Sequence, residues 1–338
     1  MPLKVYHYLP LFALMLLPAW SRTWTSLDGK KIEAELVSVE GDSVVLSMKG
    51  REYRYPIAKL SEADREYIEE SKDADPGEKP SASQGTWELF GQELKPGATT
   101  EAVGPLEDNV IRELSKNTLK PTQMKVKVRL PEDFDPSKPQ KVFWSAAAIN
   151  NEEERLQGNL ATFFRSDIAC PKGWIVIAGD TEHGNPKELK EGLTGKGDHL
   201  FHAQLVEEMT KVWPDFKNWK HACGGHSGGA KASFFRIAQL LKSDVNVVGG
   251  FFSGCNECMV SQAIEEIRVR KSAWRDIKAY HSTGDKDSLV PEDTIKRVAD
   301  EMKSSGLRKI KVETFPGGHA FSNEQFAEAL DWFVEEEP

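Results

Sequence analysis

From about residue 87 onward, short apolar runs alternate with helix-forming stretches, and this alternation constrains the fold more than any other feature. The runs with the length and composition of buried strands are Met124 to Leu130, Lys141 to Ala147, Trp174 to Ala178, His221 to Gly224, Val245 to Phe252, Ile277 to Ser282 and Ile310 to Phe315. The predicted helices are Glu152 to Phe164, His199 to Val212, Gly229 to Lys242, Asp293 to Met302 and Asn323 to Val334. Such alternation predicts an α/β fold, a mostly parallel sheet with helices on both faces. Ligands bind beyond the carboxyl ends of the strands of such sheets, so the chemistry is expected there.

Composition excludes some classes of function. The 338 residues include 44 Lys and Arg against 53 Asp and Glu, which gives a formal net charge of −9. The chain shows no basic stripe with interleaved aromatic side chains, so nucleic acid is not an expected partner. The apolar share of 39% suffices for a packed core, and the length suits a small module followed by a catalytic domain.

Residues 1 to 21 are predicted to be a signal peptide. Lys4 supplies a positive charge, Leu9 to Leu17 form an apolar run, and small residues precede an expected cleavage site after Ser21. The run is short for a membrane span, so the mature chain, starting near Arg22, is expected to have none. We therefore expect a secreted protein or one of the periplasm or cell envelope. An uncleaved anchor and a buried core segment are the alternatives.

Residues 22 to 70 are predicted to form a small β module. Glycine-containing turn signals separate short runs in which apolar and polar residues alternate, the pattern of strands with one buried face. About five strands are expected, followed by a short helix that Ser61 caps. Residues 71 to 86 are rich in Pro, Gly, Ser and charged side chains, and are predicted to link this module to a catalytic domain of residues 87 to 338.

Three segments of the module carry a resemblance to a known family: Arg22 to Lys31, Glu33 to Asp42 and Pro56 to Ser61. They are similar to the small SH3-like homology module first described in a fungal endocytic adaptor, which directly follows the signal peptide in many exported bacterial proteins. The resemblance implies an SH3-like barrel. The adaptor's binding of Asn-Pro-Phe peptides is not carried over. Docking of a peptide or protein partner and positioning of the catalytic domain are both open as roles.

The chain has four cysteines, namely Cys170, Cys223, Cys255 and Cys258. Export would permit disulfides, but four cysteines allow three complete pairings and the sequence does not choose among them. Cys255 and Cys258 have C-x-x-C spacing. No second C-x-x-C or paired histidines accompany them, so zinc is not expected. A structural disulfide and simple burial are both open.

A G-x-S-x-G motif spans Gly225 to Gly229 and places Ser227 at its centre. This motif requires a sharp turn from a strand into a helix, so that the serine is exposed on strained backbone. An apolar strand candidate precedes the motif, and an amphipathic helix pattern follows it. No phosphate-binding glycine pattern, G-x-x-x-x-G-K-[ST] or G-x-G-x-x-G, occurs here. Ser227 is therefore the candidate nucleophile.

Two later loops supply the partners of a nucleophilic serine. Asp287 follows the predicted strand that ends at Ser282, and its carboxylate could orient a histidine. Asp285 is the alternative, but its expected role is to cap the helix that begins near Asp293. His319 lies in a glycine-flanked loop after the last strand, where a base must lie to reach Ser227. We predict His319 as the base and Asp287 as its orienting acid.

The order Ser227, Asp287, His319 is that of the α/β-hydrolases. The segment Val128 to Pro139 also resembles the opening strand and turn of many such esterase domains. Residues from about 120 to 338 resemble the esterase, dienelactone-hydrolase and prolyl-oligopeptidase-like branch of that superfamily. This implies an α/β-hydrolase fold and hydrolysis of carboxylic esters through an acyl-enzyme, with no metal or organic cofactor.

The resemblance also implies an oxyanion hole of backbone N–H groups. One donor is the N–H of Gly228, directly after the nucleophile. Most relatives carry His-Gly where the second donor lies, whereas this chain has Phe143 to Asn150 at the matching stretch. Backbone donors need no particular side chain, so Ala146 or Ala147 could supply the second N–H.

The expected substrate is an ester, on a small molecule or a polysaccharide. One alternative is a serine peptidase of the prolyl-oligopeptidase type, although no propeller domain is recognisable. The other is a binding or scaffold protein on a hydrolase fold that has lost activity.

Overall fold

The computed structural model describes residues 21–27, 30–48, 51–62, 64–65, 68, 87–114, 121–146, 164–181 and 196–336. The predicted signal peptide up to residue 20, the linker 71–86, the helix predicted from Glu152 and the oxyanion-hole candidate Ala147 lie outside the described residues. The chain divides into two compact units, Met1–Gly85 and Thr86–Pro338. Each unit is described by itself.

The first unit contains a four-stranded antiparallel sheet, in which each strand pairs with the next. Its strands are β1 (Ser21–Thr25), β2 (Lys31–Glu40), β3 (Ser43–Met48) and β4 (Arg51–Pro56). About five strands were expected, and the structure adds to these four an isolated bridge between Ser26 and Leu60. Ser61 accepts a hydrogen bond from the Asp64 N–H at 3.3 Å, which is the predicted helix cap. The core consists of Trp24, Ala34, Val44, Leu46, Leu60 and Ile68.

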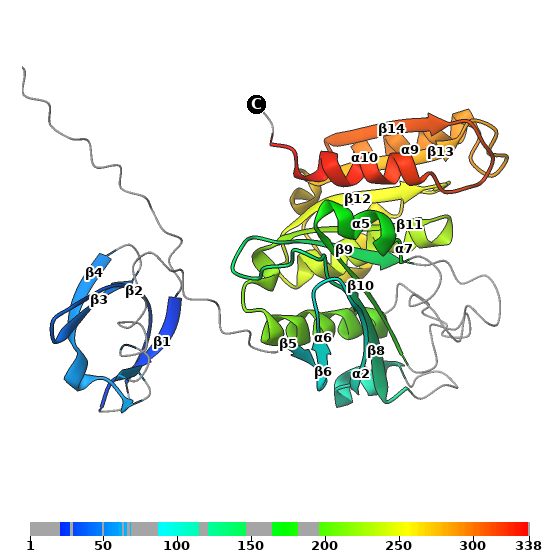
Figure 1. The fold of residues 1–338 in the computed structure, drawn as a ribbon. Helices are drawn as coiled ribbons and strands as arrows, with labels where there is room; N and C mark the ends of the chain where they lie inside the picture. The colour runs from blue at the N-terminus through cyan, green and yellow to red at the C-terminus, as the bar shows by residue number, and fades with distance from the viewer. Residues whose placement is uncertain are drawn as a thin grey trace, which may run out of the picture. The chain divides into compact units, whose positions relative to one another are not determined.

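The second unit is built on an eight-stranded sheet (Figure 1). Its strands are β7 (Thr99–Pro105), β8 (Gln123–Arg129), β9 (Lys141–Ala146), β10 (Trp174–Thr181), β11 (Lys220–His226), β12 (Val247–Ser253), β13 (Lys278–Gly284) and β14 (Lys309–Phe315). The order across the sheet is β14-β13-β12-β11-β9-β10-β8-β7. Neighbours from β14 to β10 are parallel, whereas β8 is antiparallel to both β10 and β7. A short hairpin of β5 (Trp87–Leu89) and β6 (Gln92–Leu94) precedes this sheet.

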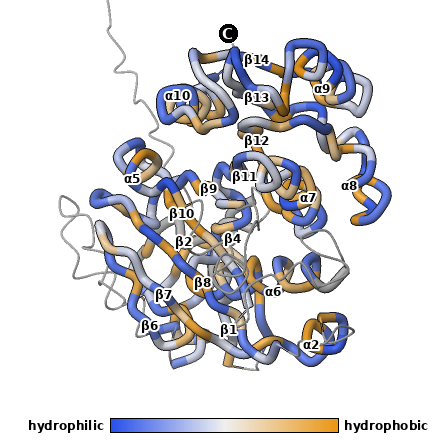
Figure 2. Tube along the Cα trace, turned by 90° about the vertical axis from the view of Figure 1, so that its right-hand side faces the viewer, coloured by the Kyte–Doolittle hydropathy of each residue, from blue (hydrophilic) through white to orange (hydrophobic). Residues whose placement is uncertain are grey.

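Helices cover both faces of the sheet, as the alternating pattern predicts. One hydrophobic core includes side chains of α2 (Asp108–Leu114), α6 (Lys196–Val212), α7 (Gly228–Lys242), α8 (Val260–Ile267) and α9 (Glu292–Ser304). The core on the other face includes side chains of α5 (Ser166–Ala169) and α10 (Asn323–Val334). β10 is buried along its whole length, and hydrophobic residues mark β10 and β8 in Figure 2. The mostly parallel, doubly covered sheet is confirmed.

All four cysteines are free in the structure. Cys170, Cys223 and Cys255 are buried and Cys258 is half-buried. Burial raises the pKa of the Cys170 and Cys258 thiols to about 11, so both are protonated near neutral pH. Within the described part of the chain, no helix is both long and apolar enough to cross a membrane.

Candidate active site

Ser227 occupies a sharp turn between β11 and α7. β11 ends at His226 and α7 begins at Gly228, so one residue makes the whole connection. Ser227 has φ 55° and ψ −119°, a conformation that costs a non-glycine residue on the order of 1–3 kcal/mol. Its N–H donates to the Ser253 carbonyl at 2.8 Å, which ties the turn to the end of β12. The strained strand–serine–helix geometry that the G-x-S-x-G motif requires is present.

Gly225 is required by close packing beneath this turn. A Cβ at this position would lie 2.3 Å from the Ala146 carbonyl oxygen and 2.4 Å from the Gly229 carbonyl carbon. Gly225 also pairs with Ala146 in the parallel ladder of β11 and β9. The first glycine of the motif therefore lets β9, β11 and α7 meet at one point.

Asp287 and His319 lie in the loops that follow β13 and β14. His319 Nδ1 is 2.7 Å from Asp287 Oδ2, and the Asp287 side chain is fully buried. Asp287 Oδ1 accepts hydrogen bonds from the N–H groups of Leu289 at 2.9 Å and Val290 at 3.2 Å. The carboxylate is thereby fixed so that it can orient the imidazole.

The charge state of Asp287 follows from these contacts. Burial favours the neutral acid, but hydrogen bonds from His319, Leu289 and Val290 outweigh it and hold the pKa below its usual value of 3.8. The group is therefore a carboxylate at neutral pH. A carboxylate accepts the Nδ1–H of the imidazole, so Nε2 is the nitrogen left for proton transfer.

Asp285 has a different role from the predicted helix cap, and that prediction is wrong. Its Oδ1 accepts a hydrogen bond from the Gly317 N–H at 3.0 Å, and its own N–H donates to the Phe315 carbonyl at 2.8 Å. These bonds join the loop of Asp287 to the loop of His319. Asp285 therefore helps to hold the two loops side by side.

The structure brings His319 close to the serine turn but does not hydrogen-bond it to Ser227. Among the described residues, His319 Nε2 is buried and has no hydrogen-bond partner. The His319 ring lies 4.8 Å from the ring of His226, the residue before Ser227. Gly254 (φ 55°) contacts both rings, because a Cβ there would lie 2.9 Å from Cε1 of each. A hydrogen bond between a catalytic base and its nucleophile often forms only when substrate binds.

His226 has a fixed environment that its place in the sequence did not reveal. Its Nδ1 is 3.0 Å from the Ser253 hydroxyl. Burial, aided by the nearby His319 and Arg165, lowers the pKa of His226 to about 4, so the ring is neutral near pH 7. His226 therefore adds no positive charge beside His319.

The two other histidines that lie near predicted strand ends are not part of the described site. His281 is buried, its Nε2 is 2.9 Å from the Cys255 carbonyl oxygen, and burial lowers its pKa to about 4. It is a core residue of β13. His183 lies outside the described residues.

The oxyanion-hole candidates lie next to the serine turn where the structure describes them. Gly228 is the first residue of α7, and the N–H groups of a helix's first turn have no acceptor within the helix. Ala146 is the last residue of β9 and lies against Gly225. The first turn of a helix also favours negative charge, so a developing oxyanion would be stabilised there.

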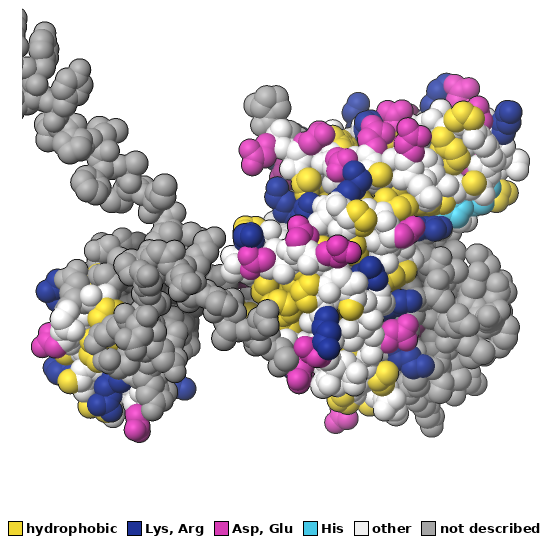
Figure 3. Space-filling view, in the orientation of Figure 1, with side chains coloured by type: hydrophobic (Ala, Val, Ile, Leu, Met, Phe, Trp, Pro, Cys, Tyr) yellow, Lys and Arg dark blue, Asp and Glu magenta, His cyan; other side chains and the backbone are white. Residues whose placement is uncertain are grey.

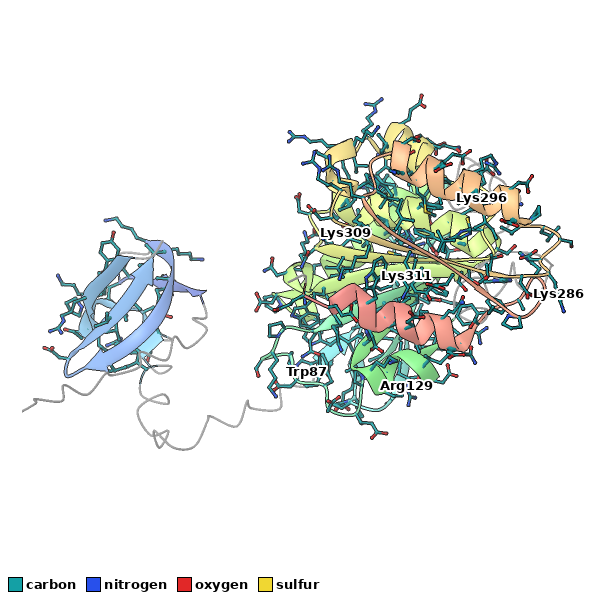
Figure 4. The ribbon with its side chains drawn as sticks, turned by 90° about the horizontal axis from the view of Figure 1, so that it is seen from above. Trp87, Arg129, Lys286, Lys296, Lys309 and Lys311 are labelled. Atoms are coloured by element: carbon teal, nitrogen blue, oxygen red, sulfur yellow. The ribbon has the colours of Figure 1, made fainter. Side chains whose placement is uncertain are left out.

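All these residues lie at the carboxyl edge of the parallel strands. Figure 3 shows histidine surface at the side of the domain where the arrows of β13 and β14 end in Figure 1. In Figure 4, Lys286 of the Asp287 loop lies beyond the strand ends, whereas Lys309 and Lys311 lie along β14 before that edge. Among the described residues, no group of three or more His, Cys, Asp or Glu side chains is placed to hold a metal ion.

Comparison with known proteins gives distant structural likenesses only. No protein-family model matches the chain, and no curated protein does. An S-formylglutathione hydrolase from Staphylococcus aureus matches with 13% identity over 70% of this chain and 100% of its own, at a TM-score of 0.43. Esterase 2 of Thermogutta terrifontis matches with 14% identity over 70% of this chain and 92% of its own, at a TM-score of 0.43. A truncated carbohydrate esterase from gut microbiota matches with 12% identity over 72% and 97%, at a TM-score of 0.45. Because these values are low, the function has to be argued from the site.

Proposed function

We propose that this chain is a serine hydrolase of the α/β-hydrolase class that cleaves carboxylic esters. Ser227 is the nucleophile, His319 the general base and Asp287 the acid that orients His319. The observation that carries the proposal is the 2.7 Å contact between His319 and a buried carboxylate, at the edge where Ser227 occupies a strained strand-to-helix turn. This combination supplies a half-buried serine hydroxyl and an oriented imidazole on one side of the sheet.

The reaction begins with attack of the Ser227 hydroxyl oxygen on the ester carbonyl carbon, while His319 Nε2 takes the hydroxyl proton. The unpartnered Nε2 is the nitrogen available for that proton. The tetrahedral oxyanion accepts hydrogen bonds from the N–H of Gly228 and from a second N–H at Ala146 or Ala147. His319 then gives its proton to the leaving alkoxide, and an acyl-serine remains.

Water completes the cycle. His319 removes a proton from the water as its oxygen attacks the acyl-serine, and returns that proton to the Ser227 oxygen as the carboxylic acid leaves. Throughout, Asp287 stabilises the imidazolium that forms twice per turnover. The positive charge of the His319 imidazolium is thus balanced by the Asp287 carboxylate.

The wider setting belongs to the same proposal. The chain is exported to the periplasm, the cell envelope or the medium after cleavage following Ser21. Its substrate is an ester of a small molecule or a polysaccharide, and the N-terminal module, an SH3-like barrel, docks a peptide or protein partner. A serine peptidase and a binding protein without activity are the competing functions.

Hydrolysis of 4-nitrophenyl acetate and longer acyl esters tests the proposal. Wild type should turn over and label with a fluorophosphonate probe, and Ser227→Ala and His319→Ala should lose activity by about 10⁴-fold or more. Ser272→Ala, an exposed serine in the short helix before β13, is the matched control and should behave as wild type. A wild-type rate equal to that of Ser227→Ala, with no labelling, would favour the binding protein. Faster cleavage of alanyl or prolyl peptides than of esters would favour the peptidase.

A further inference from the structure

Arg165 lies beside the candidate active site on unusual backbone. It directly precedes α5, with φ 44° and ψ 28°. Side chains other than Gly, Asn and Asp rarely adopt this left-handed region, and such residues concentrate at functional sites. The Cζ atom of its guanidinium lies 4.7 Å from the centroid of the Phe321 ring. Phe321 follows His319 by two residues, so this contact places a positive charge close to the candidate base.

Phe321 is itself held in place by aromatic neighbours. Its ring centroid lies 5.6 Å from those of Phe251 and Phe326, which belong to the buried core under α10. It also lies 6.5 Å from the His226 ring, which is 4.8 Å from His319. The guanidinium therefore rests on an anchored ring, and a short chain of ring contacts leads from it to the base.

The charge of Arg165 acts on the site. Burial is the main cause that lowers the pKa of His226 to about 4; the charge of His319 adds to it, that of Asp287 opposes it, and that of Arg165 adds a smaller contribution. A positive charge that affects His226, the residue before the nucleophile, also attracts any negative group of a substrate bound at Ser227. Coulomb attraction at such a half-buried position is screened less than on open surface.

We propose that Arg165 is an anion-binding subsite, which selects esters that carry a carboxylate a few bonds from the scissile carbonyl. This inference rests on the proposed ester hydrolysis and names its substrate class. A guanidinium presents its donors in a planar fork that matches the two oxygens of a carboxylate. The contact with the Phe321 ring restricts the guanidinium before any ligand binds, so the further loss of side-chain freedom on binding is small.

A packing role is the simpler explanation of the same contact. Arginine stacks on aromatic rings at many surfaces without touching a ligand, and its aliphatic stem covers apolar area. Loss of packing would reduce activity on charged and neutral esters alike. Loss of an anion subsite would reduce activity on charged esters alone, and chiefly through KM.

Two pairs of matched esters separate these roles. The first pair is the adipic acid mono-4-nitrophenyl ester and 4-nitrophenyl hexanoate, which places the carboxylate on the acyl side. The second pair is the butyryl esters of 4-hydroxybenzoate and of 4-hydroxybenzamide, which places it on the alcohol side. Each pair would be measured with wild type, Arg165→Met, Arg165→Lys and, as a control, Arg275→Met. Arg275 is an exposed arginine before β13, so its loss changes net charge equally.

In at least one pair, wild type should prefer the charged ester. Arg165→Met should lower kcat/KM for that ester about tenfold, mostly through KM, and change the neutral ester by less than about twofold. Arg165→Lys should retain part of the preference, and Arg275→Met all of it. If Arg165→Met reduces both members of each pair equally, or neither, the subsite inference is wrong while the ester-hydrolase proposal stands. If no ester is hydrolysed and no fluorophosphonate label is incorporated, the proposed function itself fails.

Discussion

The two edges of the large sheet hold their polar groups in opposite ways. At the amino edge, Lys278 donates to the carbonyls of Trp332 at 2.7 Å and Glu335 at 2.8 Å, which closes the end of α10. His221 there has partners on both ring nitrogens. At the carboxyl edge, the Nε2 of His319 is buried without a partner among the described residues, and Ser227 lies on strained backbone.

This difference separates stability from function within one sheet. The hydrogen bonds of Lys278 and His221 stabilise the amino edge, because a buried polar group without a partner costs free energy. Unpartnered atoms and strained backbone at the carboxyl edge lower stability, but they leave reactive groups free for a substrate. Substitutions at the carboxyl edge should therefore lower mainly the rate of hydrolysis, and substitutions at the amino edge mainly the free energy of unfolding.

The largest effect is expected for Asp287→Asn at the carboxyl edge. An amide there can donate to His319 Nδ1 and so favours the tautomer with the proton on Nε2, which cannot act as base. The rate of ester hydrolysis should fall by about 10⁴-fold, while the free energy of unfolding changes by no more than about 1 kcal/mol. Steady-state kinetics and urea unfolding measure the two quantities. An active Asp287→Asn would remove Asp287 from the mechanism.

The next effect concerns pH and the amino edge. His221 receives a hydrogen bond from the Trp144 indole at 2.9 Å, its Nε2 is 2.7 Å from the Phe216 carbonyl oxygen, and burial lowers its pKa to about 4. Between that value and the unfolded value of 6.5, the unfolded chain binds more protons. Stability should therefore fall as pH drops from 6.5 to 4, by on the order of 1–3 kcal/mol from this residue.

Chemical unfolding at several pH values checks this prediction. His221→Gln should have a lower free energy of unfolding than wild type at every pH. The test is therefore how steeply that free energy changes with pH in each protein. The variant should show a shallower slope than wild type between pH 6.5 and 4. Equal slopes would mean that His221 is protonated alike in the folded and unfolded states.

Lys278→Met tests whether a substitution at the amino edge lowers stability without lowering activity. The substitution leaves the carbonyls of Trp332 and Glu335 without their donor, which should cost about 1–3 kcal/mol of unfolding free energy. The rate constant for ester hydrolysis should stay as in wild type, because the site lies at the opposite edge. A large loss of kcat in the folded variant would contradict the separation of the two edges.

The smallest effect is a gain in stability. Ser227→Gly relieves the strain at φ 55° and should raise the free energy of unfolding by about 1 kcal/mol, although it removes the nucleophile. Calorimetry would register the gain as a higher Tm, beside Ser227→Ala, which keeps the strain. A lower Tm for the glycine variant would show that the turn is not a source of instability.

The parts of this fold that local patterns encode were predictable. Apolar runs mark the parallel strands, and the uniformly apolar run from Trp174 to Ala178 lies wholly buried in β10. The edge strand β7 was not predicted, since it is partly exposed and begins with Thr99, Thr100 and Glu101. β11 was predicted to end at Gly224, directly before the G-x-S-x-G motif that begins at Gly225. It continues to His226 since Gly225 pairs with Ala146 of β9.

At the site, the sequence predicts residue types but not contacts. The strand-end positions of Asp287 and His319 indicated their pairing, because neighbouring parallel strands end at one edge. The hydrogen bond from the Gly317 N–H to Asp285 and the contact of Arg165 with the Phe321 ring depend on segments that meet only after folding. No periodicity in the chain signals either contact.

Gly254 shows how a residue without a side chain can set a limit on variation. A single methyl group at this position would press against Cε1 of both His226 and His319, and the φ of 55° disfavours any other residue. In a saturation library selected for ester cleavage, Gly254 should therefore appear as intolerant as Ser227. Such data would single it out as an active-site residue, although its contribution is to provide the space in which two imidazole rings stand side by side.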